Sequence, residues 1–307
     1  MDIAQFFQQA IAPFTYGFMV KATLVSALTG AICAVLSCYV ILKGWSLMGD
    51  AVSHSVLPGV VIAYLVGLPF TVGAFAFGLL SVVSIGYIKS RSRVKEDTVI
   101  GVVFTTLFAL GLVMISKVSS EVHLSHILFG DVLGISDGAV LQTVIVGTLT
   151  LTGVLMFRKD LLLFCFDPTH ARSIGLNTTF LYYALLTVLA LTIVTALQTV
   201  GIILVVAMLV TPGATAYLLT DKFSKMLVIA AASSVFCGVV GTYISYFLDG
   251  ATGGCIVVLQ GILFMLAFFF APKHGMLAKS RERRKSQLED VLERGNLPSS
   301  AGGMGND

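Results

Sequence analysis

Nine long apolar runs dominate this sequence, and each is about as long as a membrane span. A helix needs about 20 mostly apolar residues to cross the hydrocarbon core of a bilayer. Lipid offers no hydrogen-bond partners, so each such run must satisfy its backbone within a helix. We therefore predict an all-α, polytopic membrane protein with eight or nine transmembrane helices. The runs lie at 17–41, 48–67, 70–88, 98–116, 138–157, 179–197, 201–219, 226–247 and 255–271.

The charge content supports the same fold class. Charged residues make up 11% of the 307 residues and hydrophobic residues 57%, whereas a soluble domain typically carries about a quarter charged residues. So few charges cannot cover a surface that faces water. The formal net charge of +3 is too small to favour a nucleic-acid partner.

Basic clusters set the predicted orientation, because Lys and Arg concentrate on the cytoplasmic side of a membrane protein. Such clusters lie at 89–95, 158–159 and 279–285, whereas 117–137 has no basic residue beyond Lys117. We expect an inner-membrane protein with its C-terminus in the cytoplasm. The transmembrane domain is predicted over 1–272, and a cytoplasmic polar tail, partly disordered, over 273–307.

The number of spans depends on the stretch 199–219, which contains Gly201 and the sequence Thr211-Pro212-Gly213. Backbone breaks at membrane depth are tolerated where they are buried in protein or line a cavity. A continuous helix here gives nine spans, whereas a broken or re-entrant element gives eight. The row Ala230, Ser234, Gly238 has the spacing of a close helix–helix contact.

The sequence has no phosphate-binding G-x-x-x-x-G-K-[ST] loop, which is the usual mark of an ATPase. If the protein pumps a solute, its energy must come from a partner subunit or from an ion gradient. The five cysteines form no C-x-x-C pair and are predicted to be small buried hydrophobes.

Asp50 and His54 carry the most informative chemistry. They are four residues apart at the start of an apolar run, so on a helix they share one face. A carboxylate and an imidazole suit Mn, Fe or Zn better than Cu(I). A structural packing pair between helices is the alternative. An ionisable residue at mid-membrane costs roughly 2.5–3.5 kcal/mol on insertion scales, and Pro58 and Gly59 interrupt the run nearby, so we favour a metal site.

Four potential ligands follow in the predicted external segment: Glu121, His123, His126 and Asp131. They could pass a cation inward. A solvated loop that docks a binding protein is the plainer interpretation, and we prefer it because loops carry such residues routinely.

A short capped helix is predicted on the cytoplasmic side. Asp167 can accept hydrogen bonds at its N-terminus, Pro168 suits its first position, and Gly175 can end it. Ala171 and Arg172 lie within this helix. A permease needs such an element to dock on an ATPase, although an ordinary linker helix would have the same pattern.

Gln198, Thr211 and Pro212 are candidates for a pathway or a hinge, because they are polar or helix-breaking positions in an apolar stretch. Close helix packing together with a hinge is the preferred interpretation of this stretch.

At these residues the chain resembles the ABC-3 family, the membrane permeases of ABC importers for manganese, iron and zinc. The match runs from about residue 44 to 215, and its GD-x3-H segment is closer to the manganese/iron branch. The matching segments are SLMGDAVSHSVLPGV, KEDTVIGVVF, HILFGDVLGIS, FDPTHARSIGL and QTVGIILVVAMLVTPGATA.

The resemblance implies two cytoplasmic ABC ATPase subunits, an extracytoplasmic metal-binding protein and a second permease subunit, giving a homodimer or pseudo-dimer. It also implies an intramembrane metal site that includes Asp50 and His54, and it matches the coupling helix to the segment that contains 167–175. No permanently bound cofactor is expected, because Mn²⁺, or Fe²⁺ or Zn²⁺, is the cargo.

The function expected from these features is a non-enzymatic permease subunit of an ATP-driven importer of divalent metal, foremost manganese. The first alternative is a secondary transporter that works without an ATPase. A non-transporting membrane scaffold and a permease for larger metal chelates are further alternatives.

Overall fold

The computed structural model describes residues 12–117, 134–271 and 275–276, and within them short connections join helices. Glu121, His123, His126 and Asp131, together with most of the predicted tail over 273–307, lie outside the described residues. The helices are α2 (Gly17–Lys43), α3 (Met48–Ser55), α4 (Leu57–Val66), α5 (Phe70–Arg91), α6 (Glu96–Lys117), α8 (Asp137–Met156), α9 (Arg158–Phe166), α10 (Pro168–Ser173), α11 (Thr178–Val200), α12 (Ile202–Leu219), α13 (Phe223–Leu248) and α14 (Thr252–Phe270).

Nine stretches within the described ranges are helical, long and apolar enough to cross a membrane, in agreement with the larger of the two predicted numbers. α3 and α4 together make the second of these spans, over Met48–Val66. α11 and α12 are separate spans, because the chain turns between them at Gly201, where φ is +78°. The prediction of an all-α polytopic membrane protein is confirmed.

The alternative of a helix broken at Thr211-Pro212-Gly213 is wrong, because α12 runs through Pro212 as one helix. A side chain from α2 compensates for part of the disturbed backbone hydrogen bonding. The Gly213 N–H donates to Ser37 Oγ at 2.9 Å, and Ser37 Oγ donates to the Val210 carbonyl at 3.3 Å. A neighbouring helix that re-satisfies backbone groups is how membrane helices tolerate an internal proline.

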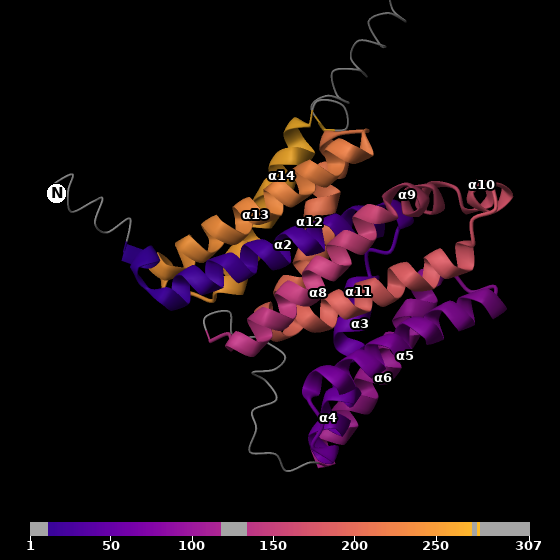
Figure 1. The fold of residues 1–307 in the computed structure, drawn as a ribbon, viewed down its shortest axis with the longest axis horizontal. Coiled ribbons are helices and arrows are strands. Elements are labelled where there is room, and N and C mark those ends of the chain that lie inside the picture. Colours follow the sequence, from indigo (N-terminus) through magenta and orange to yellow (C-terminus); the bar gives the residue numbers. More distant parts are fainter. Residues whose placement is uncertain (1–11, 118–133, 272–274, 277–307) are drawn as a thin grey trace, which may run out of the picture.

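α2 lies at the centre of one helix group and packs most extensively against α13 and α12 (Figure 1). Small residues bring these helices close together. A Cβ atom at Gly30 would meet Ser234 Oγ at 2.8 Å, and one at Gly238 would meet the Ser26 backbone at 3.3 Å. The spacing of small residues in α13 therefore marks a helix contact, as predicted.

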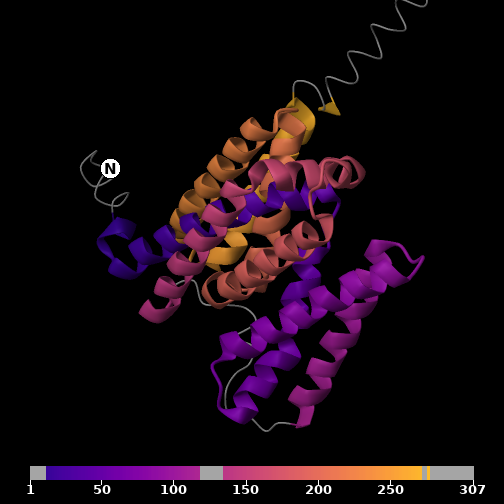
Figure 2. The ribbon, with the colours of Figure 1, turned by 45° about the vertical axis from the view of Figure 1, so that its right-hand side comes forward.

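α3, α4, α5 and α6 form a second group, seen as the purple and magenta helices at the lower right of Figure 2. α11 packs against α5, and α12 packs against α3, so these contacts join the two groups. α3 also packs against α6. The span that carries Asp50 and His54 is therefore placed where the two groups meet.

α9 is a helix that the sequence interpretation missed. Its buried side chains are Leu161, Phe164 and Cys165, and it packs against α2 and α11. Lys43 at the end of α2 donates from Nζ to the Phe164 carbonyl at 3.4 Å and lies 4.1 Å from the centroid of the Phe164 ring. α9 thereby fixes the start of the connection that leads to α10.

Candidate metal-ion site

A glycine turn sets the position of α3 in the bundle. α2 ends at Gly44, whose φ is +74°, a conformation that glycine adopts without a steric penalty. The Trp45 N–H donates to the Val40 carbonyl at 2.9 Å, and the Trp45 side chain is buried. α3 then begins at Met48, so Asp50 falls in its first turn.

α3 is short because proline follows it. Pro58 lacks the N–H that would bond to the carbonyl of His54, four residues earlier. α3 accordingly ends at Ser55, and α4 begins at Leu57 with Pro58 in its first turn. The interruption predicted near Pro58 is therefore present, within two residues of His54.

Asp50 and His54 are the two residues of α3 that are not fully buried. The Asp50 side chain is 43% exposed and the His54 side chain 27%, although both belong to a membrane-spanning stretch. The other six residues of α3, namely Met48, Gly49, Ala51, Val52, Ser53 and Ser55, are all buried.

The two side chains point toward each other, with His54 Nε2 at 3.4 Å from Asp50 Oδ1. That distance exceeds the 2.7–3.2 Å range of an ordinary N–H···O hydrogen bond. Two atoms 3.4 Å apart can both lie within about 2.2 Å of one cation. The pair is therefore close enough for both side chains to bind a single ion.

Aromatic side chains from α6 surround the imidazole. The ring centroids of Phe104 and Phe108 lie 5.5 Å and 5.1 Å from that of His54. His54 Nδ1 is buried and has no hydrogen-bond partner among the described residues. The exposed edge of the ring is thus the Nε2 edge, which faces Asp50. Sequence reasoning missed both phenylalanines, because spacing within α6 does not reveal which helix α6 meets.

Hydrogen bonds between serines hold the packed face of α3 in place. Ser81 Oγ in α5 donates to Ser55 Oγ at 3.0 Å, and Ser55 Oγ donates to the Ala51 carbonyl at 2.6 Å. α12 closes the same side, because a Cβ atom at Gly49 would lie 3.3 Å from the Leu209 side chain. α3 therefore presents its ionisable face from a fixed backbone.

The pair supplies two ligands and no more from its own surroundings. Within residues 12–117 and 134–271, no three His, Cys, Asp or Glu side chains gather as a metal-binding group. Further ligands to a cation at Asp50 and His54 must come from water, from another subunit or from residues outside these ranges.

The three pathway or hinge candidates have contacts typical of packing. Gln198 Nε2 donates to Thr71 Oγ1 at 2.7 Å, which links α11 to α5. Thr211 and Pro212 line a water-sized cavity between α12, α13 and α14, together with Thr215, Ser233, Cys237, Gln260 and Leu263. These contacts are those of helix packing, and the pathway or hinge role of the three residues stays a prediction.

α10 has the capped structure that the sequence predicts. Asp167 Oδ1 accepts from the N–H groups of Thr169 and His170, each at 2.9 Å, and Pro168 is the first residue of the helix. Gly175 follows its end with φ at +89°. α10 lies at the periphery of the bundle (Figure 1).

One face of α10 is anchored and the rest is exposed. The Ala171 side chain is buried, and the Arg172 guanidinium donates from Nη2 to Thr178 Oγ1 at 3.3 Å. Ile174, next to the C-terminal end, is 57% exposed. A rigid, exposed short helix of this kind can dock in a groove of another protein.

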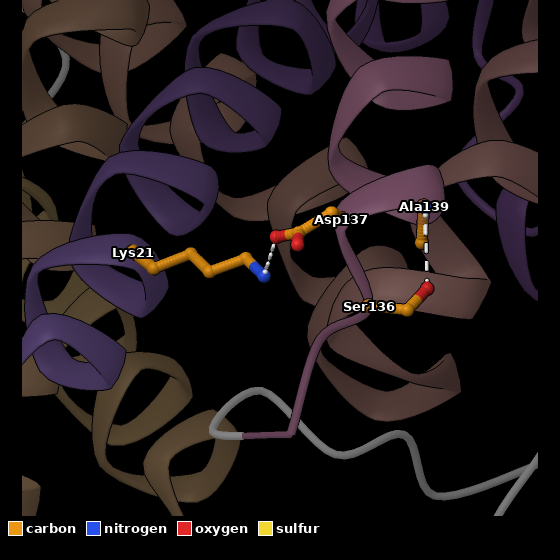
Figure 3. A network of polar contacts seen from close by, with 4 residues as sticks. All are labelled: Lys21, Ser136, Asp137 and Ala139. Carbon is orange, nitrogen blue, oxygen red and sulfur yellow. Dashed lines mark hydrogen bonds and ion pairs between the residues drawn. The ribbon is translucent and has the colours of Figure 1, made fainter.

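An ion pair that the sequence did not reveal joins the N-terminal ends of α2 and α8. Lys21 Nζ lies 2.5 Å from Asp137 Oδ1 (Figure 3). Ser136 caps α8, since its Oγ accepts from the Ala139 N–H at 3.3 Å. Residues 116 positions apart form the pair, so no local sequence pattern connects them.

The model of a protein family described as "ABC 3 transport family" matches residues 15–271. The manganese transport system membrane protein MntB of Synechocystis sp. is 58% identical over 279 residues, which cover 91% of each chain. The chelated iron transport system membrane protein YfeD of Yersinia pestis is 54% identical over 258 residues, covering 84% of this chain and 87% of YfeD.

A solved structure has a similar fold. A chain of PsaBC from Streptococcus pneumoniae, solved in complex with Fab, is 39% identical and superposes with a TM-score of 0.79. The alignment covers 87% of this chain and 97% of that chain.

Proposed function

This chain belongs to the ABC 3 transport family, and from that premise we propose that it is the permease subunit of an ATP-driven manganese importer. One observation carries the proposal. Asp50 and His54 lie 3.4 Å apart on the partly exposed face of an interrupted membrane helix. Partly exposed ionisable groups at such a depth mark ion pathways, because their contact with lipid is unfavourable.

Manganese is the proposed cargo, with iron or zinc as the alternative. The names of these relatives describe them as membrane proteins of manganese or chelated-iron transport systems. A carboxylate oxygen and an imidazole nitrogen form a donor set that Mn²⁺, Fe²⁺ and Zn²⁺ all accept. The ion is cargo, and we expect no permanently bound cofactor.

A second permease copy is proposed to cover the exposed face of α3. Asp50 and His54 provide two ligands, whereas Mn²⁺ binds more. Two copies related by a two-fold axis would bring two such pairs to one pathway, and a symmetric pair is the commonest assembly of identical chains. We therefore propose a homodimer with the metal site at or near its interface.

The transport cycle is proposed to be alternating access. An extracytoplasmic metal-binding protein delivers the ion to the external mouth, where Glu121, His123, His126 and Asp131 are predicted to lie. Asp50 and His54 replace part of its water shell. A cytoplasmic ABC ATPase docks on α10, and ATP binding switches the dimer between outward-open and inward-open states. In this topology the C-terminus is cytoplasmic.

Measurements of metal content test the cargo and the site together. We expect cells without the gene to lose manganese relative to wild type, and cells with Asp50→Ala or His54→Ala to resemble them. Asp137→Ala is the matched control, because Asp137 is an acidic residue at the start of α8, at the edge of the bundle. Normal manganese in the Asp50→Ala strain would refute the site.

Deletion of Pro168–Ile174 tests the energy source. Removal of this segment should abolish both uptake and co-purification of the ATPase. A secondary transporter, the alternative that needs no ATPase, would keep its uptake after the same deletion. Family membership favours the ATP-driven mechanism.

A further inference from the structure

The His54 imidazole lacks the support that metal-binding histidines normally have. Such a histidine usually donates its other ring N–H to a carboxylate, a carbonyl or a water, which fixes the ring and raises its basicity. If Nε2 binds the cation beside Asp50, Nδ1 carries that hydrogen. In the part of the chain that the structure describes, Nδ1 is buried and meets no acceptor.

Two aromatic rings, Phe104 and Phe108, contact the imidazole instead. They are four residues apart on α6 and so lie on one face of that helix. Phe108 meets the His54 ring edge-to-face at 78°, with centroids 5.1 Å apart, and Phe104 meets it at 50° with centroids 5.5 Å apart. The two rings are themselves 6.1 Å apart. The imidazole therefore packs against both phenyl rings.

The two phenyl rings restrict rotation of the His54 imidazole without strengthening His54 as a metal ligand. Rotation of the imidazole about its Cβ–Cγ bond would exchange the positions of its Nδ1 and Nε2 edges. The half-buried Phe104 and Phe108 rings pack against the imidazole and hinder this rotation. An N–H group beside an aromatic ring gains only a weak interaction compared with a bond to a carboxylate. Nε2 is thus held toward Asp50, while Nδ1 has no hydrogen-bond acceptor among the described residues.

We propose that Phe104 and Phe108 are positioning residues for metal transport: they hold His54 Nε2 toward Asp50 and keep polar acceptors away from Nδ1. The inference rests on the proposed function, and it assigns this face of α6 to the metal site. An ion in transit must bind well enough to enter and weakly enough to leave. A histidine that is oriented but not reinforced meets both requirements.

Leucine substitutions test the role of the rings. The permease–ATPase complex is reconstituted in proteoliposomes, and initial rates of Mn²⁺ uptake are measured for F104L, F108L and the double variant. We expect KM for Mn²⁺ to rise about tenfold in F108L, the effect typical of lost support around a metal ligand, with kcat unchanged. Mn²⁺ binding to the same complex without ATP should weaken by the same factor.

Two further variants separate positioning from packing. F108Y keeps the ring and should keep the wild-type KM. F236L makes the same Phe-to-Leu change at an exposed position on α13 and should alter neither KM nor the thermal unfolding midpoint. If F108L and F108Y raise KM equally, or if F108L lowers kcat while KM stays constant, the positioning role is overturned.

Asp50→Ala and His54→Ala distinguish this inference from the proposed function. If both retain full Mn²⁺ binding, the metal site itself is misplaced. If both lose binding but F104L, F108L and the double variant bind Mn²⁺ as tightly as wild type, the site stands and only the role of the rings fails. If F108L does not fold, F104L and Phe108→Met test the positioning role instead, through the same measurements of KM and Mn²⁺ binding.

Discussion

Lys21 and Asp137 join the ends of α2 and α8 at the edge of the bundle, whereas Asp50 and His54 lie together on α3 within a span. The first pair is in direct contact at 2.5 Å, and Asp137 is 99% exposed. The second pair is 3.4 Å apart and partly enclosed. The edge pair is a close ion pair at the surface, while the inner pair holds an oxygen and a nitrogen close enough to share a cation.

The comparison shows that a carboxylate paired with a basic side chain has a different role at the surface than within a membrane span. Exposed ion pairs contribute about 0–1 kcal/mol to stability, because water and salt screen them. A carboxylate within a span has no such screening and must find a partner. Four substitutions, ordered by expected effect, test this contrast.

Asp50→Asn should give the largest change. The amide has the shape of the carboxylate without its charge, so Mn²⁺ uptake is expected to fall by at least about 100-fold, beyond the usual loss for residues that only support a ligand. Asp137→Asn, the matched change at the edge pair, should lower uptake less than twofold. Initial rates of uptake in proteoliposomes provide the measurement. Equal losses in the two variants would remove the distinction between the pairs.

Gly213→Val tests whether the inner pair depends on the α2–α12 crossing. A Cβ atom at Gly213 would lie 2.7 Å from the backbone carbonyl of Ser37, and overpacking of this kind costs about 1–3 kcal/mol. We expect a lower thermal unfolding midpoint and reduced uptake, because α12 also touches α3. Gly101→Val is the control, since that Cβ atom meets nothing within 4 Å. An unchanged midpoint in Gly213→Val would contradict the close crossing.

Asp167→Ala extends the comparison to an acidic residue that binds backbone rather than metal. Loss of an N-cap costs about 1 kcal/mol, so metal-stimulated ATP hydrolysis by the assembled complex should fall severalfold. Asp167→Ser restores a capping oxygen and should recover most of the activity. If the Ser variant were as impaired as the Ala variant, the charge of Asp167 and not its cap would matter.

Lys21→Met should give the smallest change. At low salt we expect it to lower the thermal unfolding midpoint slightly, because the pair is exposed. At high salt the difference from wild type should vanish through screening. Thermal unfolding midpoints at two ionic strengths measure this. A loss that persists in high salt would mean that Lys21 acts through packing.

The sequence predicts the spans well because lipid demands long apolar runs. It also predicts the interruption near Pro58 and the caps of α10, since proline, Asp167 and Gly175 act on their own backbone neighbours. Local chemistry of this kind does not depend on the rest of the fold.

Other features depend on contacts between distant segments and could not be predicted. Ser37 allows α12 to continue through Pro212, and nothing in the sequence around Pro212 indicates that a serine on α2 lies beside it. α9 begins with Arg158, Lys159 and Asp160, so its apolar stretch is too short to resemble a span. The position of α6 beside His54 is likewise a consequence of assembly.

Burial of the native thiols has a practical consequence for following the coupling step. Cys33, Cys38, Cys165 and Cys237 are buried, and burial raises the pKa of the Cys165 thiol to about 12. The thiolate is the form that attacks alkylating reagents, so Cys165 should resist them near neutral pH. Cys255 is only partly buried and would first be changed to serine. A cysteine introduced at the exposed Ile174 would then be labelled selectively, and its protection would report when another protein covers α10.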